Sequence, residues 1–210
     1  MYNDITGIIL SGGKSKRMGE NKSLLKIGDR TVIEYVNDLM KSLFSKVILI
    51  TNNPIEYEFL DIEMYDDIFF QMGPLAGIHS GLIHSKTVKN FITSCDIPLM
   101  TAQMIEYLVE YNTNKPITIA KADGFIQQLC GLYNKSCLQQ AEKILFDQKK
   151  FEVEEKGTKN KKCNVLNLID VVGAEIIDAE SLAIYKKDIF FNMNKRSDFE
   201  IVLQKLKHQN

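Results

Sequence analysis

The sequence predicts an α/β protein with three layers, in which helices cover both faces of a mainly parallel, Rossmann-like sheet. Short apolar runs typical of buried strands alternate with segments of helical periodicity through the first half of the chain. This alternation indicates right-handed strand–helix–strand units, because parallel neighbours need a crossover between them. No internal repeat or low-complexity linker divides the 210 residues, so we expect one domain spanning 1–210.

The first half of the chain carries the clearest signals. Residues 6–10 are an apolar run that ends at Ser11-Gly12-Gly13, as expected of a buried strand entering a loop. Residues 31–43 carry apolar side chains at intervals of three and four, which predicts an amphipathic helix. Similar reasoning predicts a strand at 46–51, a short helix at about 54–60, a strand at about 62–65, a helix at 75–86 and a strand at 90–95.

The second half is less regular. Thr101 is a typical N-cap and predicts a helix that runs to about residue 112. The segment 148–162 is polar with little periodicity, and we expect a mobile surface loop there. The other expected elements are strands near 116–121 and 126–133, a helix near 135–147, short strands at about 164–168 and 187–191, and a last helix at 196–207.

Composition excludes several classes of protein. Apolar residues make up 45% and charged residues 25%, which are ordinary globular values, and the net charge of −1 gives no global basic field for nucleic acid. No apolar run approaches the roughly 18 residues of a membrane span, and the N-terminus lacks the pattern of a signal peptide. The four cysteines form no CxxC pair, so we expect reduced, mostly buried thiols, no structural zinc and a cytoplasmic location.

Positive charge is concentrated in the loop after the first predicted strand. Residues 14–30 contain six basic and two acidic side chains, a net charge of +4. The Gly12-Gly13 pair lets backbone N–H groups approach an anion, Arg17 can bind phosphate oxygens with its forked donors, and Lys22 adds a compact charge. The loop matches neither GxxxxGK[ST] nor GxGxxG. It therefore suits a triphosphate, the alternative being a glycine-rich turn with a solvated basic rim.

Carboxylates and amides follow other predicted strands. Asp96 comes directly after one strand, where it could hold Mg²⁺ against phosphates or cap the loop. Asp66 and Asp67 come after another, and a carboxylate there could accept both N–H donors of a guanine edge or be a surface acid. Asn192 and Asn194 could reach metal or phosphate, or could be turn residues.

Four segments carry motifs in a recognisable order. Residues 7–19, continued to Lys22, resemble the N-terminal signature of nucleotidyltransferases that act on nucleoside triphosphates. Residues 73–78 (GPLAGI), 94–99 (SCDIPL) and 191–199 (FNMNKRSDF) are similar to later segments of one such family. The family is that of the molybdenum cofactor guanylyltransferases, the MobA family, and the resemblance extends from about residue 5 to 205.

The resemblance implies a nucleotidyltransferase fold and transfer of GMP from GTP to molybdenum–molybdopterin. The products would be the molybdopterin guanine dinucleotide cofactor and pyrophosphate, with Mg²⁺ as the cofactor. Molybdopterin-synthesis proteins and apo-molybdoenzymes are the implied protein partners, with no nucleic acid or membrane partner.

The resemblance also implies roles for individual residues of this chain. Carried over, the nucleotide contacts fall on Leu10, Ser11 and Gly12, the phosphate contact on Lys22, the base or ribose contact on Asn52, the guanine contact on Asp66, and the Mg²⁺ and GTP contact on Asp96. From the chemistry of the loop, we expect Gly13 to bind the nucleotide as well, and Arg17 to stabilise the developing pyrophosphate together with Lys22. Counting back from Gly73 favours Asp66 as the guanine reader, and a one-residue gap would give Asp67 instead. Arg17, Lys22 and Asp96 would be the catalytic residues.

Three departures from the family accompany these matches. In the last motif, Lys195, Arg196 and Ser197 stand where the family has Thr-Pro-Glu. Ser11 stands where the family usually has alanine, and Gln128 stands in place of a family proline in a segment that helps to shape the pterin side. The alternatives are a related nucleotidyltransferase that uses CTP or another acceptor, and a catalytically silent GTP-binding protein that delivers cofactor. The implied in-line attack needs positioning and charge neutralisation rather than a side-chain nucleophile, and no Ser/His/Asp or Cys/His arrangement is suggested by spacing.

Overall fold

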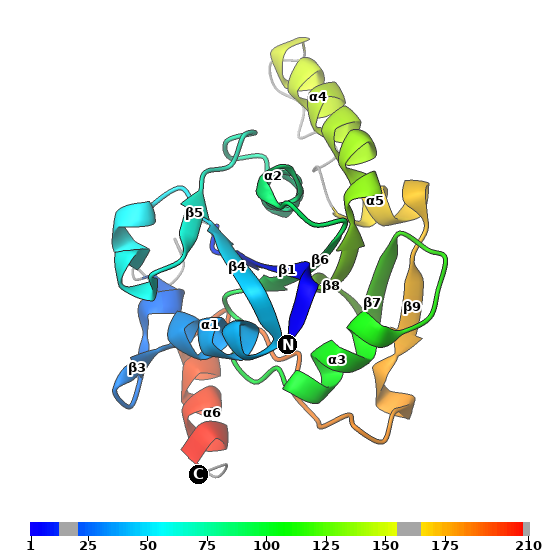
Figure 1. Ribbon diagram of the computed structural model, residues 1–210. Helices are drawn as coiled ribbons and strands as arrows, with labels where there is room; N and C mark the ends of the chain where they lie inside the picture. Colours follow the sequence, from blue (N-terminus) through cyan, green and yellow to red (C-terminus); the bar gives the residue numbers. More distant parts are fainter. Residues whose placement is uncertain (13–20, 155–164, 208–210) are drawn as a thin grey trace.

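The computed structural model describes residues 1–12, 21–154 and 165–207 of the chain. Its main sheet has seven strands in the order β5-β4-β1-β6-β8-β7-β9, and β2 and β3 form a separate two-stranded sheet (Figure 1). The strands are β1 (Tyr2–Leu10), β2 (Lys26–Ile27), β3 (Arg30–Thr31), β4 (Phe44–Ile50), β5 (Glu63–Tyr65), β6 (Lys89–Ser94), β7 (Ile117–Ala122), β8 (Phe125–Asn134) and β9 (Glu175–Asp178).

Helices cover both faces of this sheet. The helices α1 (Val32–Leu43) and α3 (Ala102–Glu110) lie on one face, and α2 (Pro74–His84), α4 (Leu138–Glu154) and α5 (Val165–Val172) lie on the other (Figure 1). The last helix, α6 (Arg196–Lys207), packs near β2 and the start of α1. Four short 3₁₀ segments complete the described structure: η1 (Lys22–Leu24), η2 (Pro54–Leu60), η3 (Lys135–Cys137) and η4 (Ala179–Ser181).

The centre of the sheet is parallel. β1 pairs in parallel with β4 and with β6, and β4 pairs in parallel with β5. β8 is antiparallel to β6 and β7, while β9 is again parallel to β7. The predicted three-layer fold with a mainly parallel sheet is therefore confirmed, and the carboxyl ends of β1, β4, β5 and β6 lie at one edge.

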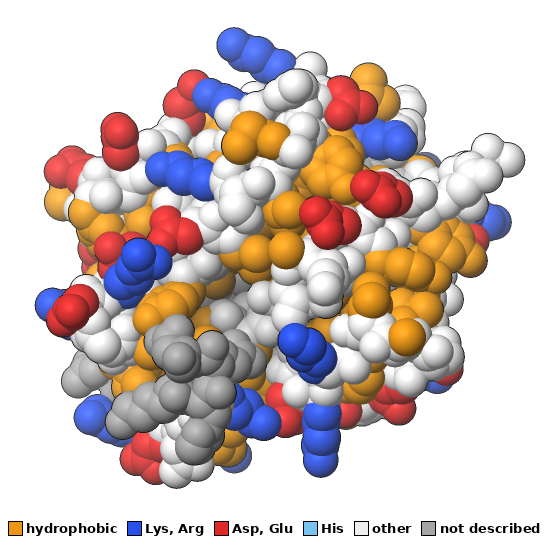
Figure 2. All heavy atoms as spheres, turned by 60° about the horizontal axis from the view of Figure 1, so that its bottom comes forward, with side chains coloured by type: hydrophobic (Ala, Val, Ile, Leu, Met, Phe, Trp, Pro, Cys, Tyr) orange, Lys and Arg blue, Asp and Glu red, His pale blue; other side chains and the backbone are white. Residues whose placement is uncertain are grey.

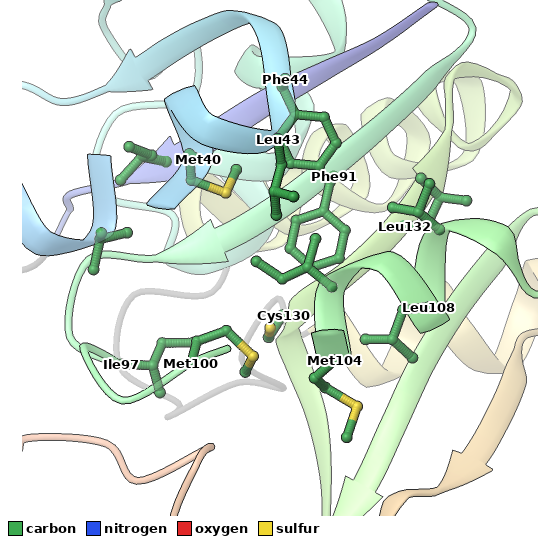
Figure 3. Close-up of a cluster of buried hydrophobic side chains, with 14 of the residues drawn as sticks. Met40, Leu43, Phe44, Phe91, Ile97, Met100, Met104, Leu108, Cys130 and Leu132 are labelled. Carbon is green, nitrogen blue, oxygen red and sulfur yellow. The ribbon is translucent and has the colours of Figure 1, made fainter. Parts of the chain in front are cut away.

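The strand β1 is buried on both faces, which explains its continuous apolar run. Ile9 contributes to the cluster under α1 and α3, whereas Ile8 contributes to the cluster under α2, because successive side chains of a strand point to opposite faces. Under α1, Phe44 stacks on Phe91 with ring centroids 5.7 Å apart, and methionine and leucine side chains from α1 and α3 fill the space around them (Figure 3).

Several predicted elements agree with the structure. The helices predicted at 31–43, 75–86 and 196–207 correspond to α1, α2 and α6. Thr101 caps α3 as predicted, since its hydroxyl accepts a hydrogen bond from the amide of Met104.

The predictions for the strands after residue 160 are wrong. Residues 165–172 form the helix α5, because a short apolar run fits a buried helix as well as a strand. Residues 187–191 form turns closed by backbone hydrogen bonds from Ile189 to Lys186 and from Phe191 to Asp188. The strand that does form in this region is β9, which periodicity did not indicate.

The prediction of a loop at 148–162 is also partly wrong. Residues 148–154 continue the helix α4, and the rest of that segment lies outside the described residues. Gln, Lys and Glu are good helix formers, and neither glycine nor proline interrupts the sequence before Gly157. Helix propensity therefore extends α4 beyond the end of its apolar periodicity.

The surface agrees with the balanced composition. On the face shown in Figure 2, basic and acidic side chains are interspersed, with hydrophobic side chains between them. Among the described residues, the helices are all too short or too polar to cross a bilayer.

One titratable side chain is enclosed between the helices of the second layer. His79 of α2 is completely buried, and neither ring nitrogen has a hydrogen-bond partner among the residues that the structure describes. The ring of Phe69 packs edge-on against it, and the Nε2 atom lies 3.9 Å from a carboxylate oxygen of Glu142 on α4. Burial lowers the pKa of His79, and the nearby charge of Glu142 opposes this shift only in part.

This burial predicts a loss of stability in mild acid. The unfolded chain binds a proton at His79 with a pKa near 6.5, whereas the folded chain binds it only at lower pH, so the free energy of unfolding falls as the pH drops below about 6.5. We expect His79→Leu to reduce the difference in unfolding free energy measured by urea titration at pH 7.5 and pH 5.5. His84→Gln, on the same helix but partly exposed, should keep the wild-type difference. An unchanged difference in His79→Leu would show that other groups cause the acid sensitivity.

Candidate active site at the carboxyl edge of the sheet

The loops that follow the central strands converge at one edge of the sheet. Beyond the strand ends, the amide of Ser11 donates to the carbonyl of Ile50 at 2.9 Å, and the amide of Cys95 donates to the carbonyl of Leu10 at 3.1 Å. The amide of Thr51 likewise donates to Tyr65 at 2.9 Å. These bonds continue the ladder by one residue and fix the starts of the loops that carry the polar side chains.

Asp67 and Asn52 form a reciprocal pair at this edge. The Nδ2 of Asn52 donates to Oδ2 of Asp67 at 2.9 Å, and the Asp67 amide donates to Oδ1 of Asn52 at 3.0 Å. A Cβ atom on Gly12 would lie 4.0 Å from one Asp67 oxygen, and a Cβ on Gly77 would lie 3.6 Å from the other. The Asp67 carboxylate therefore lies beside the start of the glycine loop and the first turns of α2.

The surroundings of Asp67 shift the pKa of its carboxyl group. Burial raises the pKa of the carboxyl group, and the charge of Asp66 adds to the rise, while the hydrogen bond from Asn52 lowers it. A carboxylate that is partly withdrawn from water and oriented by an amide is a good acceptor for paired N–H donors.

Asp66, the residue favoured by counting back from Gly73, is exposed and lies outside this pair. Neighbouring side chains at the end of an extended strand point to opposite sides, so only one of two adjacent acids can face the loops. The structure brings Asp67 to Asn52, Gly12 and Gly77, which places it, rather than Asp66, in the candidate site.

Asp96 is the second carboxylate of the site, and it is partly buried. The hydroxyl of Ser94 donates to its Oδ1, and the Asn192 side chain is also hydrogen-bonded to it. Burial raises the pKa of Asp96, whereas the hydrogen bond from Ser94, the positive charge of Lys22 and the Asn192 contact lower it. The net rise shows that these contacts do not fully replace the water that the carboxylate has lost.

The C-terminal segment before α6 closes this side of the site. The amide of Met193 donates to the backbone carbonyl of Asp96 at 3.0 Å, and Lys22 Nζ donates to Oδ1 of Asn194 at 3.3 Å. Asn192 and Asn194, which the sequence left as either ligands or turn residues, thus lie beside Asp96 and Lys22.

The side chains at the site that could ligate a metal ion limit the kind of ion that it could hold. Among the described residues there is no group of three or more His, Cys, Asp or Glu side chains placed to bind a metal ion. Mg²⁺ in phosphate-handling sites usually has one or two protein carboxylates and takes its other ligands from water and phosphate. Asp96 fits an ion that arrives with a nucleotide rather than one held in a protein cage.

The surroundings of Cys95, the residue before Asp96, disfavour the thiolate form of its side chain. Burial, together with the charge of Asp96, raises the pKa of Cys95 to about 12. Cys95 is free and half-buried, and Cys130 and Cys137 are free and buried, whereas Cys163 lies outside the described residues. This agrees with a site that works by positioning and charge.

The structure describes the predicted phosphate loop at its two ends, up to residue 12 and from residue 21. Gly13 and Arg17 lie outside the described residues, so their expected contacts stay predictions. Leu10 ends β1 at the site edge and Ser11 and Gly12 follow it, as predicted, while Lys22 lies near enough to Asp96 for its charge to act on that carboxylate.

The sequence did not reveal Tyr57. This side chain of η2 is buried, and its hydroxyl contacts Ser11, Asn21 and Ser23. The feature of the sequence that could have indicated it is the position of Tyr57 in the short helix that follows β4, a strand that ends at the site.

Comparison with known proteins places these features in a wider group. A family model described as "MobA-like NTP transferase domain" matches residues 7–160. The chain is 34% identical over 203 residues to a protein of Carboxydothermus hydrogenoformans named "Probable molybdenum cofactor guanylyltransferase", covering 96% of both chains. It is 32% identical over 200 residues to a Clostridium perfringens protein of the same name, covering 94% of this chain and 95% of the other.

Solved structures show the same fold. The molybdopterin-guanine dinucleotide biosynthesis protein A of Archaeoglobus fulgidus matches with a TM-score of 0.78 at 19% identity, covering 97% of this chain and 99% of that chain. A putative protein of Aquifex aeolicus matches with a TM-score of 0.71 at 28% identity, covering 91% of this chain and 94% of that chain.

The partial burial of Asp96 predicts that its charge costs stability. Because its pKa is higher in the folded than in the unfolded chain, the cost is present at neutral pH and disappears as the pH falls toward the unfolded value near 3.9. Asp96→Asn should therefore be more stable than wild type at pH 7.5, by on the order of 1 kcal/mol. Thermal unfolding at pH 7.5 and 4.5 measures this, and the gain should shrink at the lower pH.

Asp66→Asn serves as the matched control, because Asp66 is an exposed acid at the same edge. It should leave the melting temperature nearly unchanged at both pH values. A destabilised Asp96→Asn protein at pH 7.5 would contradict the prediction.

Proposed function

The chain belongs to the MobA-like NTP transferase domain family, and on this basis we propose that it transfers GMP from GTP to molybdenum–molybdopterin. The products are the molybdopterin guanine dinucleotide cofactor and pyrophosphate. The names of relatives that are 28–34% identical over most of the chain support this assignment to a nucleotidyltransferase of molybdenum cofactor biosynthesis.

One structural observation carries the proposal. Two distinct polar clusters lie at the same sheet edge, on either side of the end of β1: Asn52 with Asp67, and Lys22 with Asp96. The first offers paired acceptors suited to a base edge, and the second offers a cation and a carboxylate suited to phosphates with a divalent ion. A nucleoside triphosphate is a ligand with both kinds of group.

The reaction proceeds by in-line displacement at the α-phosphate of GTP. An oxygen of the molybdopterin phosphate forms a bond to the α-phosphorus, and the bond between that phosphorus and the oxygen leading to the β-phosphate breaks. The electron pair leaves with pyrophosphate. The acceptor phosphate is already an anion at neutral pH, so the protein contributes position and positive charge rather than a base.

Each residue then has a defined task. Lys22 stabilises the negative charge that develops on the leaving pyrophosphate, and Arg17 is assigned to the same phosphates. Asp96 would hold Mg²⁺, which neutralises phosphate charge when bound. Ser94 and Asn192 orient the Asp96 carboxylate.

On the base side, Asp67 accepts the N1–H and N2–H donors of guanine, and Asn52 fixes its orientation. The backbone of residues 10–12 borders the nucleotide. The expected partners, namely molybdopterin-synthesis proteins and apo-molybdoenzymes, and the cytoplasmic location remain predictions.

The deciding experiment incubates the protein with each nucleoside triphosphate, Mg²⁺ and molybdopterin and measures pyrophosphate release. We expect release with GTP above all others. Lys22→Ala should lower the rate by about 10²–10³-fold, the usual cost of removing one group that stabilises charge in the transition state. Preference for CTP would identify a cytidylyltransferase, and GTP binding without pyrophosphate release would indicate a delivery protein.

A second prediction concerns the choice of base. ITP lacks the exocyclic amino group of GTP, so a carboxylate that accepts two N–H bonds should favour GTP over ITP. Asp67→Asn should lower kcat/KM for GTP by about 10–100-fold, since hydrogen bonds to a charged group contribute about 1.5–3 kcal/mol, and should affect ITP less. The ratio of kcat/KM for the two nucleotides measures this.

Asp66→Asn is the matched control and should keep the wild-type ratio. If Asp66→Asn lost the preference for GTP and Asp67→Asn kept it, the assignment of the base reader would have to be reversed.

A further inference from the structure

The hydroxyl of Tyr57 connects the two segments that border the phosphate loop. On one side Ser11, the residue after β1, donates from Oγ to the Tyr57 hydroxyl at 2.7 Å. On the other side the Nδ2 of Asn21 donates to the same hydroxyl at 2.8 Å, and the Oγ of Ser23 lies 2.9 Å from it. The Tyr57 hydroxyl oxygen therefore links Ser11, before the loop, to Asn21 and Ser23, which follow the loop 10 and 12 positions later in the sequence.

The direction of every bond in this network follows from the available protons. Asn21 Oδ1 can only accept, so the Ser23 hydroxyl donates to it at 2.7 Å and uses its single proton. Tyr57 must therefore donate to Ser23, which leaves the Tyr57 oxygen to accept from Ser11 and Asn21. Tyr57, Ser23 and Asn21 thus form a closed ring of hydrogen bonds, with Ser11 attached to it.

The network lies largely out of water, which makes it costly to break. Tyr57 is 2% exposed, Ser23 1% and Ser11 9%. The ring of Tyr57 packs in the core under α1, and the second Nδ2 proton of Asn21 reaches Glu56 at 2.6 Å. A buried donor or acceptor that loses its partner pays the full penalty of desolvation, so the network holds its members in one arrangement.

Lys22 lies between the two residues that Tyr57 holds. The side chains of Asn21 and Ser23 are fixed by the network, and the amide of Ser23 also donates to Asn21 Oδ1 at 3.2 Å. The Lys22 ammonium group then donates to Asn194 at 3.3 Å, and its charge acts on Asp96 on the phosphate side of the site.

We propose that Tyr57 is a positioning residue that sets Lys22 and the start of the phosphate loop at a fixed separation. The role rests on the proposed function, because that function identifies the bound group as the phosphates of GTP. The link to β1 depends on the Ser11 hydroxyl, which donates to Tyr57.

The test uses Tyr57→Phe, which keeps the packed ring and removes only the hydroxyl. Its first readout does not depend on any substrate: amide hydrogen exchange at residues 21–25 should become faster, while exchange in α3 stays unchanged. Tyr2→Phe is the matched control, since it loses one hydroxyl contact, to Glu110, at the opposite end of β1. Unchanged exchange at 21–25 in Tyr57→Phe overturns the proposal, whatever the substrate of the enzyme.

The second readout asks whether Tyr57 acts through Lys22. We expect Tyr57→Phe to raise the dissociation constant for GTP about tenfold, and Ser11→Ala to raise it less, because that change removes one of three contacts. In a Lys22→Ala background the same Tyr57→Phe change should have an effect of less than about twofold, as expected for two residues that act together.

Additive effects in the double variant would overturn the positioning role and leave Tyr57 as a purely structural residue. Wild-type protein that bound no GTP would instead contradict the proposed function, and the exchange measurement would still decide whether Tyr57 anchors residues 21–25.

Discussion

Every part of the candidate site depends on the parallel pairing of β1 with β4 on one side and β6 on the other. Parallel strands end at the same edge, so Leu10, Ile50 and Ser94 lie side by side in register. The next residues extend the ladder through the Ser11 and Cys95 amides, which fixes where each loop begins. This pairing is possible because β1 is apolar on both faces and is covered by α1 and α3 on one side and α2 on the other.

The candidate site contains partly buried charged groups, whereas the core beneath it contains apolar side chains. In the core, apolar side chains exclude water, whereas at the edge two carboxylates are partly withdrawn from water and have raised pKa values. Asn52 and Ser94 each supply one hydrogen bond and recover only part of the hydration that is lost. Such groups reduce the stability of the protein without ligand, and they interact strongly with a ligand that brings complementary charge.

Contacts between distant parts of the chain complete the arrangement. The helix α6 packs Val202 against Ile27, Leu99 and Met193, which brings the preceding segment across the sheet edge to Asp96. Tyr57, from the 3₁₀ segment after β4, ties the end of β1 to the residues around Lys22. The two carboxylates and the lysine are therefore held by three separate segments, each anchored in apolar packing.

The sequence by itself determined the alternation of strands and helices and the parallel centre of the sheet. It also determined the positions of Asn52 and Asp96 just beyond strand ends, and of Lys22 near the end of the loop that follows the first strand. These features follow from local periodicity and from motifs with fixed spacing. Tertiary structure decided the rest. Residues 165–172 became a helix, because burial on one side suits a helix as well as a strand. Asp67 rather than Asp66 reached Asn52, because strand geometry allows only one of two adjacent side chains to face the site. The Tyr57 network was not visible in the sequence, because its members come together only when distant segments fold against one another.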